Sequence, residues 1–330
     1  MKVLITGGTG AIGPRVVDAM YKAGFMVRVF SADPPFPCLF PESTEVVVGN
    51  INDKDAVRSS MQGVEAVVHM AALLHIVNPT PELREKYEQV NVNGTATVVD
   101  AAIREGVGRV VLFSTIAVYG EAGGRILNEK SLTRPETYYA RTKLVAEGIV
   151  LDAKGPDGKK LGVVLRLGAV YGSRIKGNYE RLTKALARNR FVPVGKGFNR
   201  RTLVYDKDVG NAAVLAVSHP DAAGMIFNVT DGTFHTLNEI IESICSALGR
   251  RPPLLSLPVG PTRALMGLIE KGCGALGIKP FVTRGMLDKY TEDIAVDGSL
   301  IQKELGFVPH YDLKSGWEET IKDLRKGKGI

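Results

Sequence analysis

The chain has 330 residues, of which 45% are hydrophobic and 23% charged, and it contains no low-complexity tract or fixed-period repeat. This composition excludes a disordered or repeat protein, and the length suits one large α/β unit with a smaller lobe, or two domains. The net charge of +7 comes from scattered Lys and Arg residues, so we expect no nucleic-acid partner.

The first half of the chain alternates short apolar runs with stretches of helical periodicity. The predicted strands are Lys2–Thr6, Met26–Phe30, Glu45–Val48, Ala66–His69, Val110–Ser114 and Val163–Leu167, and the predicted helices are Pro14–Ala23, Asp53–Ser60, Tyr87–Arg104 and Tyr139–Leu151. Several strands are apolar almost without a break, as strands covered on both faces must be. The alternation indicates an α/β protein with a doubly wound, Rossmann-like parallel sheet.

After about Tyr171 the alternation breaks, and proline and glycine become more frequent. We predict a dinucleotide-binding domain over residues 1–171 and a smaller substrate lobe over residues 172–330, interleaved with the sheet. Within the lobe, helices are predicted at Tyr179–Arg190, Asp206–Ser218 and Leu237–Leu248, and a strand at Met225–Val229. Residues 263–276 are apolar with scattered glycines and predict a helix that packs on the core. A membrane-surface helix is the alternative, because the polar face is weakly basic.

The sequence shows no sign of a targeting segment or a membrane span. MKVLIT leads directly into a glycine-rich turn and leaves no room for a signal peptide. No run approaches the roughly 20 apolar residues of a transmembrane helix. Cys38, Cys245 and Cys273 are widely spaced and lack metal-ligand or redox-pair spacing. We therefore expect a cytoplasmic protein.

A glycine-rich turn, TGGTGAIG at residues 6–13, joins the first predicted strand to the first predicted helix. Glycine is needed where a turn demands a positive φ, where the backbone must approach a pyrophosphate, and where helix and strand pack closely. The N-terminus of the helix then presents free N–H groups and a partial positive charge to phosphates. At the first strand-to-helix junction, this turn predicts a dinucleotide site.

Tyr139 and Lys143 lie four residues apart in YYARTKLVAE, so a helix would carry both side chains on one face. A free tyrosine has a pKa of about 10, which is too high for an efficient base at neutral pH. A neighbouring ammonium and an oxidised nicotinamide ring both favour the phenolate, so we expect a lowered pKa for Tyr139. Tyr138 has uncharged Thr142 at the same interval. An ordinary surface pair is the alternative, but beside a glycine turn we interpret Tyr139 and Lys143 as catalytic.

The spacing Gly7-x-x-Gly10-x-x-Gly13 resembles that of the extended short-chain dehydrogenase/reductase superfamily, and the resemblance extends across nearly the whole chain. Asn50-Ile51 resembles the pair that contacts adenine, with asparagine in place of an acid. HMAAL at residues 69–73 resembles the fourth-strand loop beneath the cofactor ribose, and NVNGT at residues 91–95 resembles the motif whose first asparagine approaches the cofactor. The resemblance implies cofactor contacts by Gly7, Gly10, Ala11, Ile12, Gly13, Asn50, Ile51, Ala71, Ala72, Leu73, Asn91, Tyr139 and Lys143.

The same resemblance implies a third catalytic residue in FSTIAVYG. Thr115 occupies the place of the serine or threonine that hydrogen-bonds the substrate oxygen. Ser114 is the alternative, but adjacent strand residues face opposite sides, so only one of the two should reach the site. Ser31 directly follows the second predicted strand, at the place where NAD-using relatives commonly carry an acid, and no arginine comes next to bind a 2′-phosphate. With Asp33 as a possible substitute, we expect NAD as the cofactor and NADP as the alternative.

The second half resembles nucleotide-sugar epimerases and dehydratases. RLGAVYG at residues 166–172 resembles their sixth-strand motif, and Asn178 lies where a substrate-contacting asparagine often falls. Arg201 lies where an arginine grips the nucleotide diphosphate, a task that suits its planar fork of donors. A salt bridge from Arg201 to Asp206 or Asp208 is the alternative. No acid follows Thr115 directly, which disfavours dehydration.

The leading hypothesis is an NAD-dependent nucleotide-sugar epimerase that works by transient hydride transfer. The alternatives are an oxidoreductase of a hydroxysteroid-like or other hydrophobic alcohol, and a catalytically silent dinucleotide sensor. Resembling enzymes dimerise through the helices predicted at Tyr87–Arg104 and Tyr139–Leu151, so we expect a homodimer. His69 and His75 lack ligand spacing, and His219, His235 and His310 stand alone, so we expect no metal site.

Overall fold

The computed structural model describes residues 1–74, 80–278, 280 and 283–327. Its centre is a parallel seven-stranded sheet with strand order β11-β7-β5-β4-β1-β2-β3. The strands are β1 (Lys2–Thr6), β2 (Met26–Ser31), β3 (Glu45–Val48), β4 (Ala66–His69), β5 (Arg109–Thr115), β7 (Gly162–Leu167) and β11 (Ile226–Val229). The sheet and its Rossmann-like winding confirm the predicted fold class, and the predicted strands match within one residue at each end.

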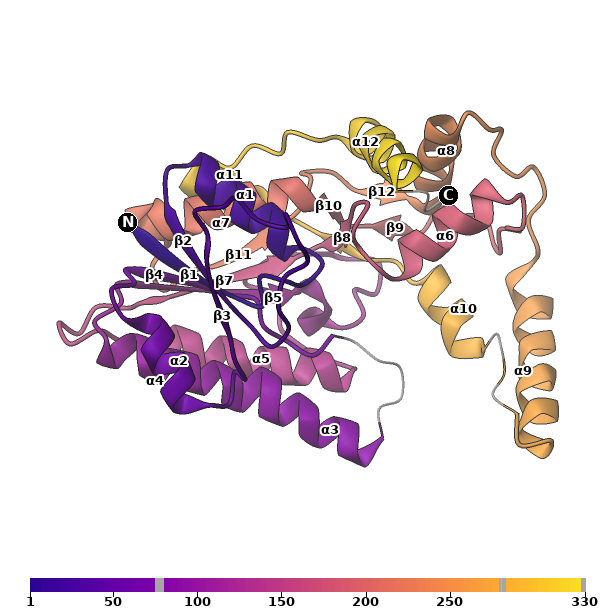
Figure 1. Cartoon of the computed structure of the whole chain (residues 1–330). Helices are drawn as coiled ribbons and strands as arrows, with labels where there is room; N and C mark the ends of the chain where they lie inside the picture. The colour runs from indigo at the N-terminus through magenta and orange to yellow at the C-terminus, as the bar shows by residue number, and fades with distance from the viewer. Residues whose placement is uncertain (75–79, 279, 281–282, 328–330) are drawn as a thin grey trace.

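Helices cover both faces of the sheet, as Figure 1 shows. One face packs against α1 (Gly13–Lys22), α7 (Asp206–Ser218) and α11 (Ser299–Leu305), and the other against α2 (Lys54–Met61), α4 (Gly94–Arg104) and α5 (Tyr138–Asp152). Every residue of β4 and β7 is buried, because helices cover both faces of these strands. From β1 the chain continues to β2 and β3 on one side, and then crosses back to β4 on the other side of β1. A ligand crevice is therefore expected at the carboxyl ends of β1 and β4.

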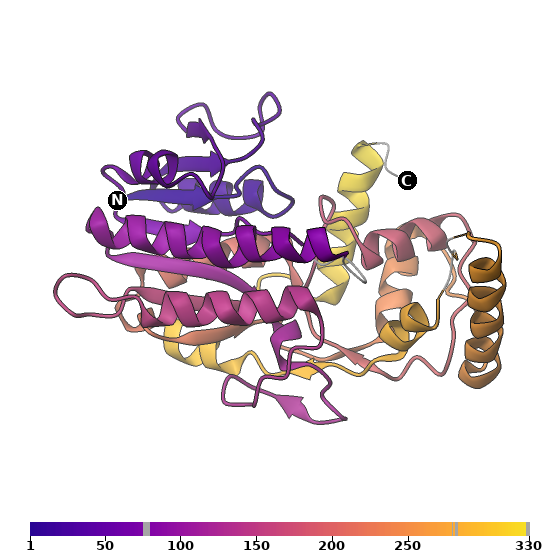
Figure 2. The same ribbon diagram turned by 90° about the horizontal axis from the view of Figure 1, so that it is seen from below.

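The helix predicted at Tyr87–Arg104 begins earlier and is not regular. It consists of α3 (Pro81–Tyr87), a π-helical turn (Glu88–Asn93) and α4, which follow one another without a break. Seen from below in Figure 2, this long helical stretch runs beside α5. Single π-helical turns are often found at functional sites.

The second half adds a separate apolar core beside the sheet. This core is built from α6 (Asn178–Ala187), α8 (Leu237–Leu248), α12 (Leu313–Lys326) and two strands that pair in parallel, β8 (Ala169–Tyr171) and β10 (Leu203–Tyr205). The remaining strands form two short pairs: β9 (Arg200–Arg201) with β12 (His235–Thr236), and β6 (Ile126–Leu127) with β13 (Ala295–Val296). No helix in the described part of the chain is long and apolar enough to cross a membrane.

Two helices lie outside these cores, α9 (Val259–Ala275) and α10 (Arg284–Thr291). The prediction that residues 263–276 pack on the core is wrong. None of the leucine, isoleucine or methionine side chains of α9 is buried. An apolar segment with glycines at intervals predicts a helix but does not reveal which surface the helix meets.

Candidate active site

The glycine turn between β1 and α1 has no space for side chains at two of its glycines. Gly7 has a φ of +72°, and a Cβ there would lie 2.8 Å from backbone atoms of Ala71. A Cβ on Gly13 would lie 1.9 Å from the carbonyl oxygen of Gly8. No side chain among the described residues caps the N-terminus of α1. The turn and this open helix end therefore form a site that suits a phosphate group.

The loop after β4 lies against the glycine turn and is anchored by buried side chains. The hydroxyl of Thr6 contacts Nδ1 of His69 at 2.7 Å and accepts a hydrogen bond from the backbone N–H of Ala71 at 3.3 Å. Farther along the loop, the Asn91 amide accepts from the N–H of Leu73 at 2.7 Å and donates to its carbonyl at 3.2 Å. The loop that was predicted to lie beneath the cofactor ribose is thus fixed from both ends.

Asn91 connects this loop to α5. It lies in the π-helical turn, is 1% exposed, and also donates to the hydroxyl of Thr142 at 3.1 Å. The predicted approach of Asn91 to a cofactor stays a prediction. What its contacts indicate is a positioning role, because its amide oxygen and nitrogen already have protein partners.

Lys143 points into the protein from the middle of α5. It is 2% exposed, and burial lowers its pKa to about 8, although the nearby Glu147 carboxylate opposes this shift. Burial and then the charge of Lys143 lower the pKa of His69 to about 3, so the His69 imidazole is neutral. His69 contacts Thr6, the first residue of the glycine turn, and the charge of Lys143 reaches His69.

Tyr139 lies one helical turn before Lys143 and is half-buried. Its ring packs against that of Tyr87, with the centroids 6.4 Å apart. Burial and then Tyr87 raise the pKa of Tyr139 to about 12. This is opposite to the predicted direction. The predicted lowering of the Tyr139 pKa required the charges of Lys143 and of an oxidised nicotinamide ring to outweigh burial, whereas in the protein alone burial has the largest effect.

The two neighbouring hydroxyls at the end of β5 face different surroundings. Ser114 is buried and donates to a Glu147 oxygen at 2.5 Å. Thr115 is half-buried, and its hydroxyl accepts a hydrogen bond from the N–H of Ala117 at 3.2 Å. The Ser114 hydroxyl is therefore used in a buried hydrogen bond to α5, which leaves Thr115 as the candidate for substrate contact.

Sequence reasoning missed the buried ion pair beneath these residues. Glu147 on α5 meets Arg166 on β7 through three N···O contacts of 2.6 to 3.1 Å. The Arg166 guanidinium also lies over the ring of Tyr119, 4.8 Å from its centroid. The only sequence signal for Glu147 was its position four residues after Lys143, on the same helix face.

Three other predicted cofactor residues lie at the ends of the strands. Ser31 is buried at the end of β2, and its hydroxyl accepts from the N–H of Thr9 in the glycine turn at 3.2 Å. Asn50 is exposed, and its side-chain oxygen accepts from the N–H of Asn52 at 3.0 Å. Ile51 is buried, and a Cβ on Gly94 would lie 2.9 Å from its side chain.

The predicted substrate residues lie in the lobe. Asn178 begins α6, is exposed, and lines a pocket together with Tyr179 and Trp317. The Arg201 guanidinium donates to the carbonyl oxygens of Lys289 and Tyr290 at 2.5 and 2.9 Å, and lies 3.8 Å from the Glu292 carboxylate.

The alternative partners proposed for Arg201 are wrong, because both carboxylates are engaged elsewhere. Asp206 pairs with Arg15, with the two charged groups 3.3 Å apart. Asp208 accepts backbone hydrogen bonds from His310 and Tyr311. Glu292 is far from Arg201 in the sequence, and sequence spacing gives no sign of this contact.

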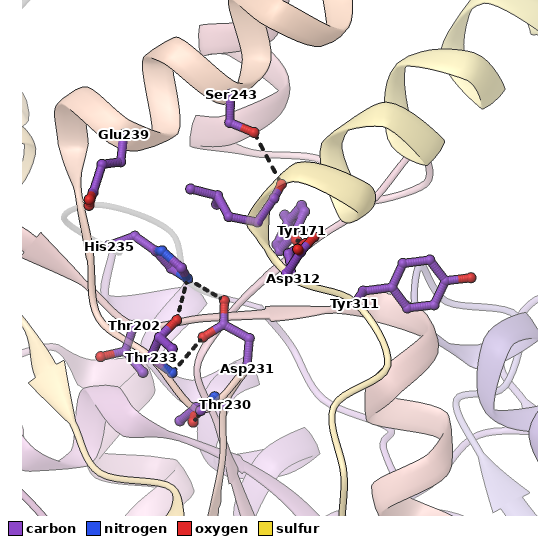
Figure 3. Close-up of polar contacts among 12 residues, drawn as sticks. Tyr171, Thr202, Thr230, Asp231, Thr233, His235, Glu239, Ser243, Tyr311 and Asp312 are labelled. Atoms are coloured by element: carbon purple, nitrogen blue, oxygen red, sulfur yellow. Dashed lines mark hydrogen bonds and ion pairs between the residues drawn. The ribbon is translucent and has the colours of Figure 1, made fainter.

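His235 was predicted to stand alone, but it has a buried carboxylate partner, drawn in Figure 3. Its Nε2 lies 2.6 Å from Asp231 and 2.9 Å from the Thr233 hydroxyl. His310 lies 3.4 Å from Asp208 and His219 lies 3.9 Å from Asp221. These pairs correct the predicted isolation of the three histidines. His75 lies outside the described residues.

Residues 3–230 match the model of the NAD dependent epimerase/dehydratase family. The UDP-glucose 4-epimerase of Vibrio cholerae is 27% identical over 328 residues, which cover 97% of this chain and 94% of the relative. The 3 beta-hydroxysteroid dehydrogenase/Delta 5-->4-isomerase of Mycobacterium tuberculosis is 29% identical, with 97% and 89% covered. The solved structure of MoeE5 with UDP-glucose and NAD has a TM-score of 0.78 and 26% identity, with 99% and 100% covered.

Proposed function

The chain belongs to the NAD dependent epimerase/dehydratase family, and on that premise we propose that it is an epimerase of a nucleotide sugar. As a member of this family it is an enzyme, and its cofactor is NAD. The observation that carries the proposal is that Asn91 joins Thr142, the neighbour of Lys143 on α5, to the loop that lies against the glycine turn. This turn suits a dinucleotide phosphate, and Tyr139 lies one helical turn before Lys143. The full-length similarity to a UDP-glucose 4-epimerase supports the substrate class.

The residues at the crevice fit the dinucleotide. Gly7, Gly10 and Gly13, with the uncapped N-terminus of α1, would hold the pyrophosphate, and residues 71–73 would support the ribose. The bound dinucleotide would supply a reversible acceptor for the hydride of a sugar carbon, so the protein would have to move only the matching proton.

Tyr139 would take the proton from the sugar hydroxyl and later return it. Lys143, with a pKa of about 8, is protonated at neutral pH. Its charge and that of an oxidised nicotinamide ring would favour the phenolate form of Tyr139 against burial, which raises the pKa of Tyr139. The hydroxyl of Thr115 would hydrogen-bond the reacting oxygen. Rotation of the keto sugar between the two half-reactions would present its other face and so invert the carbon.

Arg201 would bind the diphosphate of the substrate. Burial raises the pKa of its present partner, Glu292, so this carboxylate is protonated, and loses its negative charge, more readily than an exposed one. A diphosphate could therefore take its place next to the guanidinium. The paired donors of arginine match two phosphate oxygens.

The test is to incubate the enzyme with UDP-glucose and other UDP-sugars and to follow the sugar protons by NMR. We expect an epimer to form without accumulation of reduced nicotinamide. Tyr139→Phe should lower kcat by about a hundredfold to ten-thousandfold, because it removes the proton-transferring hydroxyl. Tyr138→Phe is the matched control and should keep its activity, because Tyr138 donates to Glu88 at 2.8 Å on the outside of α5. Turnover of no UDP-sugar, or full activity in Tyr139→Phe, contradicts the proposal.

An oxidoreductase of a hydrophobic alcohol is the second candidate. One observation favours it: the hydrogen bonds of Arg201 go to carbonyl oxygens of its own chain, which leaves less of the guanidinium for a diphosphate. The similarity to a hydroxysteroid dehydrogenase covers as much of the chain as the similarity to the epimerase. This candidate predicts that absorbance of reduced nicotinamide rises in step with substrate oxidation, which epimerisation does not produce. If UDP does not bind and the absorbance of reduced nicotinamide rises in this way, the oxidoreductase is the better assignment.

A further inference from the structure

Helix α9 stands at one end of the molecule, away from the sheet. Both views place it at the end opposite the N-terminus, with α10 beside it (Figures 1 and 2). Among the described residues, 10 of the 24 large apolar side chains that are exposed lie between Leu254 and Met286, about a tenth of the chain. Single exposed apolar residues are ordinary, but a concentration of them marks an interaction surface.

The polar side of α9 faces α10. Arg263 pairs with Asp288 at 2.9 Å and Glu270 pairs with Arg284 at 2.7 Å. A Cβ on Gly267 would lie 3.3 Å from the Arg284 side chain. These contacts fix the rotation of α9 about its own axis.

The opposite side of α9 is an apolar stripe without a charge. At about 100° per residue, Leu265, Leu268 and Leu276 lie on the side turned away from Gly267 and Glu270. They are 58%, 67% and 75% exposed. Leu254 and Leu255, in the extended segment before the helix, are 96% and 82% exposed and enlarge the surface. We call these five leucines the leucine stripe.

Positive charge flanks the leucine stripe. Residues 250–278 contain four Lys or Arg residues and one Glu. In the described part of the chain, Arg251 and Lys271 are exposed and take part in no ion pair. Arg251 precedes the two leucines of the extended segment, and Lys271 lies on α9 beside the stripe. An exposed apolar stripe bordered by cations is the pattern of a helix that lies in the interface of an anionic membrane.

We infer that α9 binds the surface of an anionic phospholipid bilayer, with the leucine stripe in the acyl boundary and the flanking cations at the headgroups. A second copy of the chain is a poorer occupant, because two such surfaces would bring like charges together. The predicted homodimer uses α4 and α5 and leaves α9 uncovered. The inference does not depend on which substrate the enzyme takes.

The test is flotation of the purified full-length protein with phosphatidylcholine vesicles, with and without phosphatidylglycerol. We expect binding to the anionic vesicles, weaker binding to the neutral ones, and release at high salt. Leu265→Gln/Leu268→Gln/Leu276→Gln should weaken binding by at least about tenfold, because each change removes apolar contact with the acyl chains. Arg251→Gln/Lys271→Gln should remove the preference for anionic vesicles.

The matched control is Leu132→Gln/Ile126→Gln/Val308→Gln, whose sites are 70%, 54% and 64% exposed in other parts of the surface. This control should bind vesicles like the unchanged protein, and NAD binding by every variant checks that it is folded. The inference is overturned if anionic vesicles float no protein, or if the α9 variant floats as well as the control. A dimer that is seen by sedimentation and lost only in the α9 variant would also overturn it, in favour of a second copy.

Discussion

Lys143 carries a positive charge in an almost fully buried position. Its pKa of about 8, against 10.5 for a free lysine, means that the folded chain holds this proton less tightly than the unfolded chain does. Between these two pH values the unfolded chain binds more protons, so stability rises with pH through this window. Below about pH 8 the buried charge costs the folded state up to about 3 kcal/mol.

Lys143→Met should therefore stabilise the protein at pH 7 while it removes activity. The carboxylate of Glu147 keeps a partner in the variant, because Arg166 holds it with a contact of 2.6 Å. We expect a gain of about 1 to 3 kcal/mol in the free energy of unfolding at pH 7, which shrinks towards zero near pH 10.5. Urea unfolding at the two pH values measures the gain. A variant less stable than the original at pH 7 would show that Lys143 contributes more to folding than its burial costs.

Among the site residues, the sequence predicted those relations that follow from the spacing of residues along one helix or one strand. The interval from Tyr139 to Lys143 and the opposite directions of Ser114 and Thr115 are of this kind, since both follow from backbone periodicity. The Glu147–Arg166 pair and the contact of Arg201 with Glu292 join distant segments. The direction of the Tyr139 pKa was also out of reach, because both its burial and the nearness of Tyr87 are tertiary properties.

The glycine turn is the element on which the cofactor site depends, and its glycines serve different purposes. Gly13 packs α1 against the turn, while Gly10 is exposed and a Cβ there would meet only the carbonyl oxygen of Gly7, at 3.1 Å. Gly13 is therefore needed for folding, whereas the missing side chain of Gly10 leaves space at the surface for a ligand.

Gly10→Ala and Gly13→Ala should separate these two purposes. Gly10→Ala should change the free energy of unfolding by less than about 0.5 kcal/mol. It should weaken NAD binding by at least about tenfold, because its methyl group would stand where the pyrophosphate approaches. Gly13→Ala should cost about 2 kcal/mol or more through the overlap with Gly8. Calorimetric NAD titration and thermal unfolding of both variants measure the two effects, and equal losses of stability would refute the distinction.

Elements were predictable where local pattern and tertiary packing agree. The central strands are continuously apolar, and their bounds match the prediction closely. The π-helical turn was not predictable, because it accompanies the hydrogen bonds that Asn91 makes with Leu73 and Thr142, which only the folded chain brings together. The surface that α9 presents was also not predictable, because helical periodicity does not say whether the apolar side meets protein, lipid or water.

The whole molecule is tied together by segments that cross between its halves. β11 and α7 come from the second half but complete the sheet and its helical cover. Arg15 on α1 lies 3.3 Å from Asp206 on α7 and 3.3 Å from Asp323 on α12. The boundary at residue 171 stays a prediction, and these contacts suggest that it separates two regions of one cooperative unit.

The only tryptophan of the chain, Trp317, offers a test of that cooperativity. It is buried in the lobe, where it stacks on Tyr171 with the ring centroids 4.7 Å apart, so its fluorescence follows the lobe. Far-UV circular dichroism follows mainly the larger sheet and its helices. We expect both signals to change at the same urea concentration, because β11, α7 and Arg15 join the two regions.

Arg15→Ala should move both transitions together to lower urea. The change leaves the Asp206 carboxylate buried without its partner, which costs about 3 kcal/mol or more when the broken pair is well buried and less here, since Arg15 is partly exposed. If fluorescence instead changed at lower urea than circular dichroism in the unchanged protein, the lobe would be an independently unfolding domain. Coincident transitions in both proteins mean that the strands and helices shared between the halves, more than this ion pair, make the molecule one folding unit.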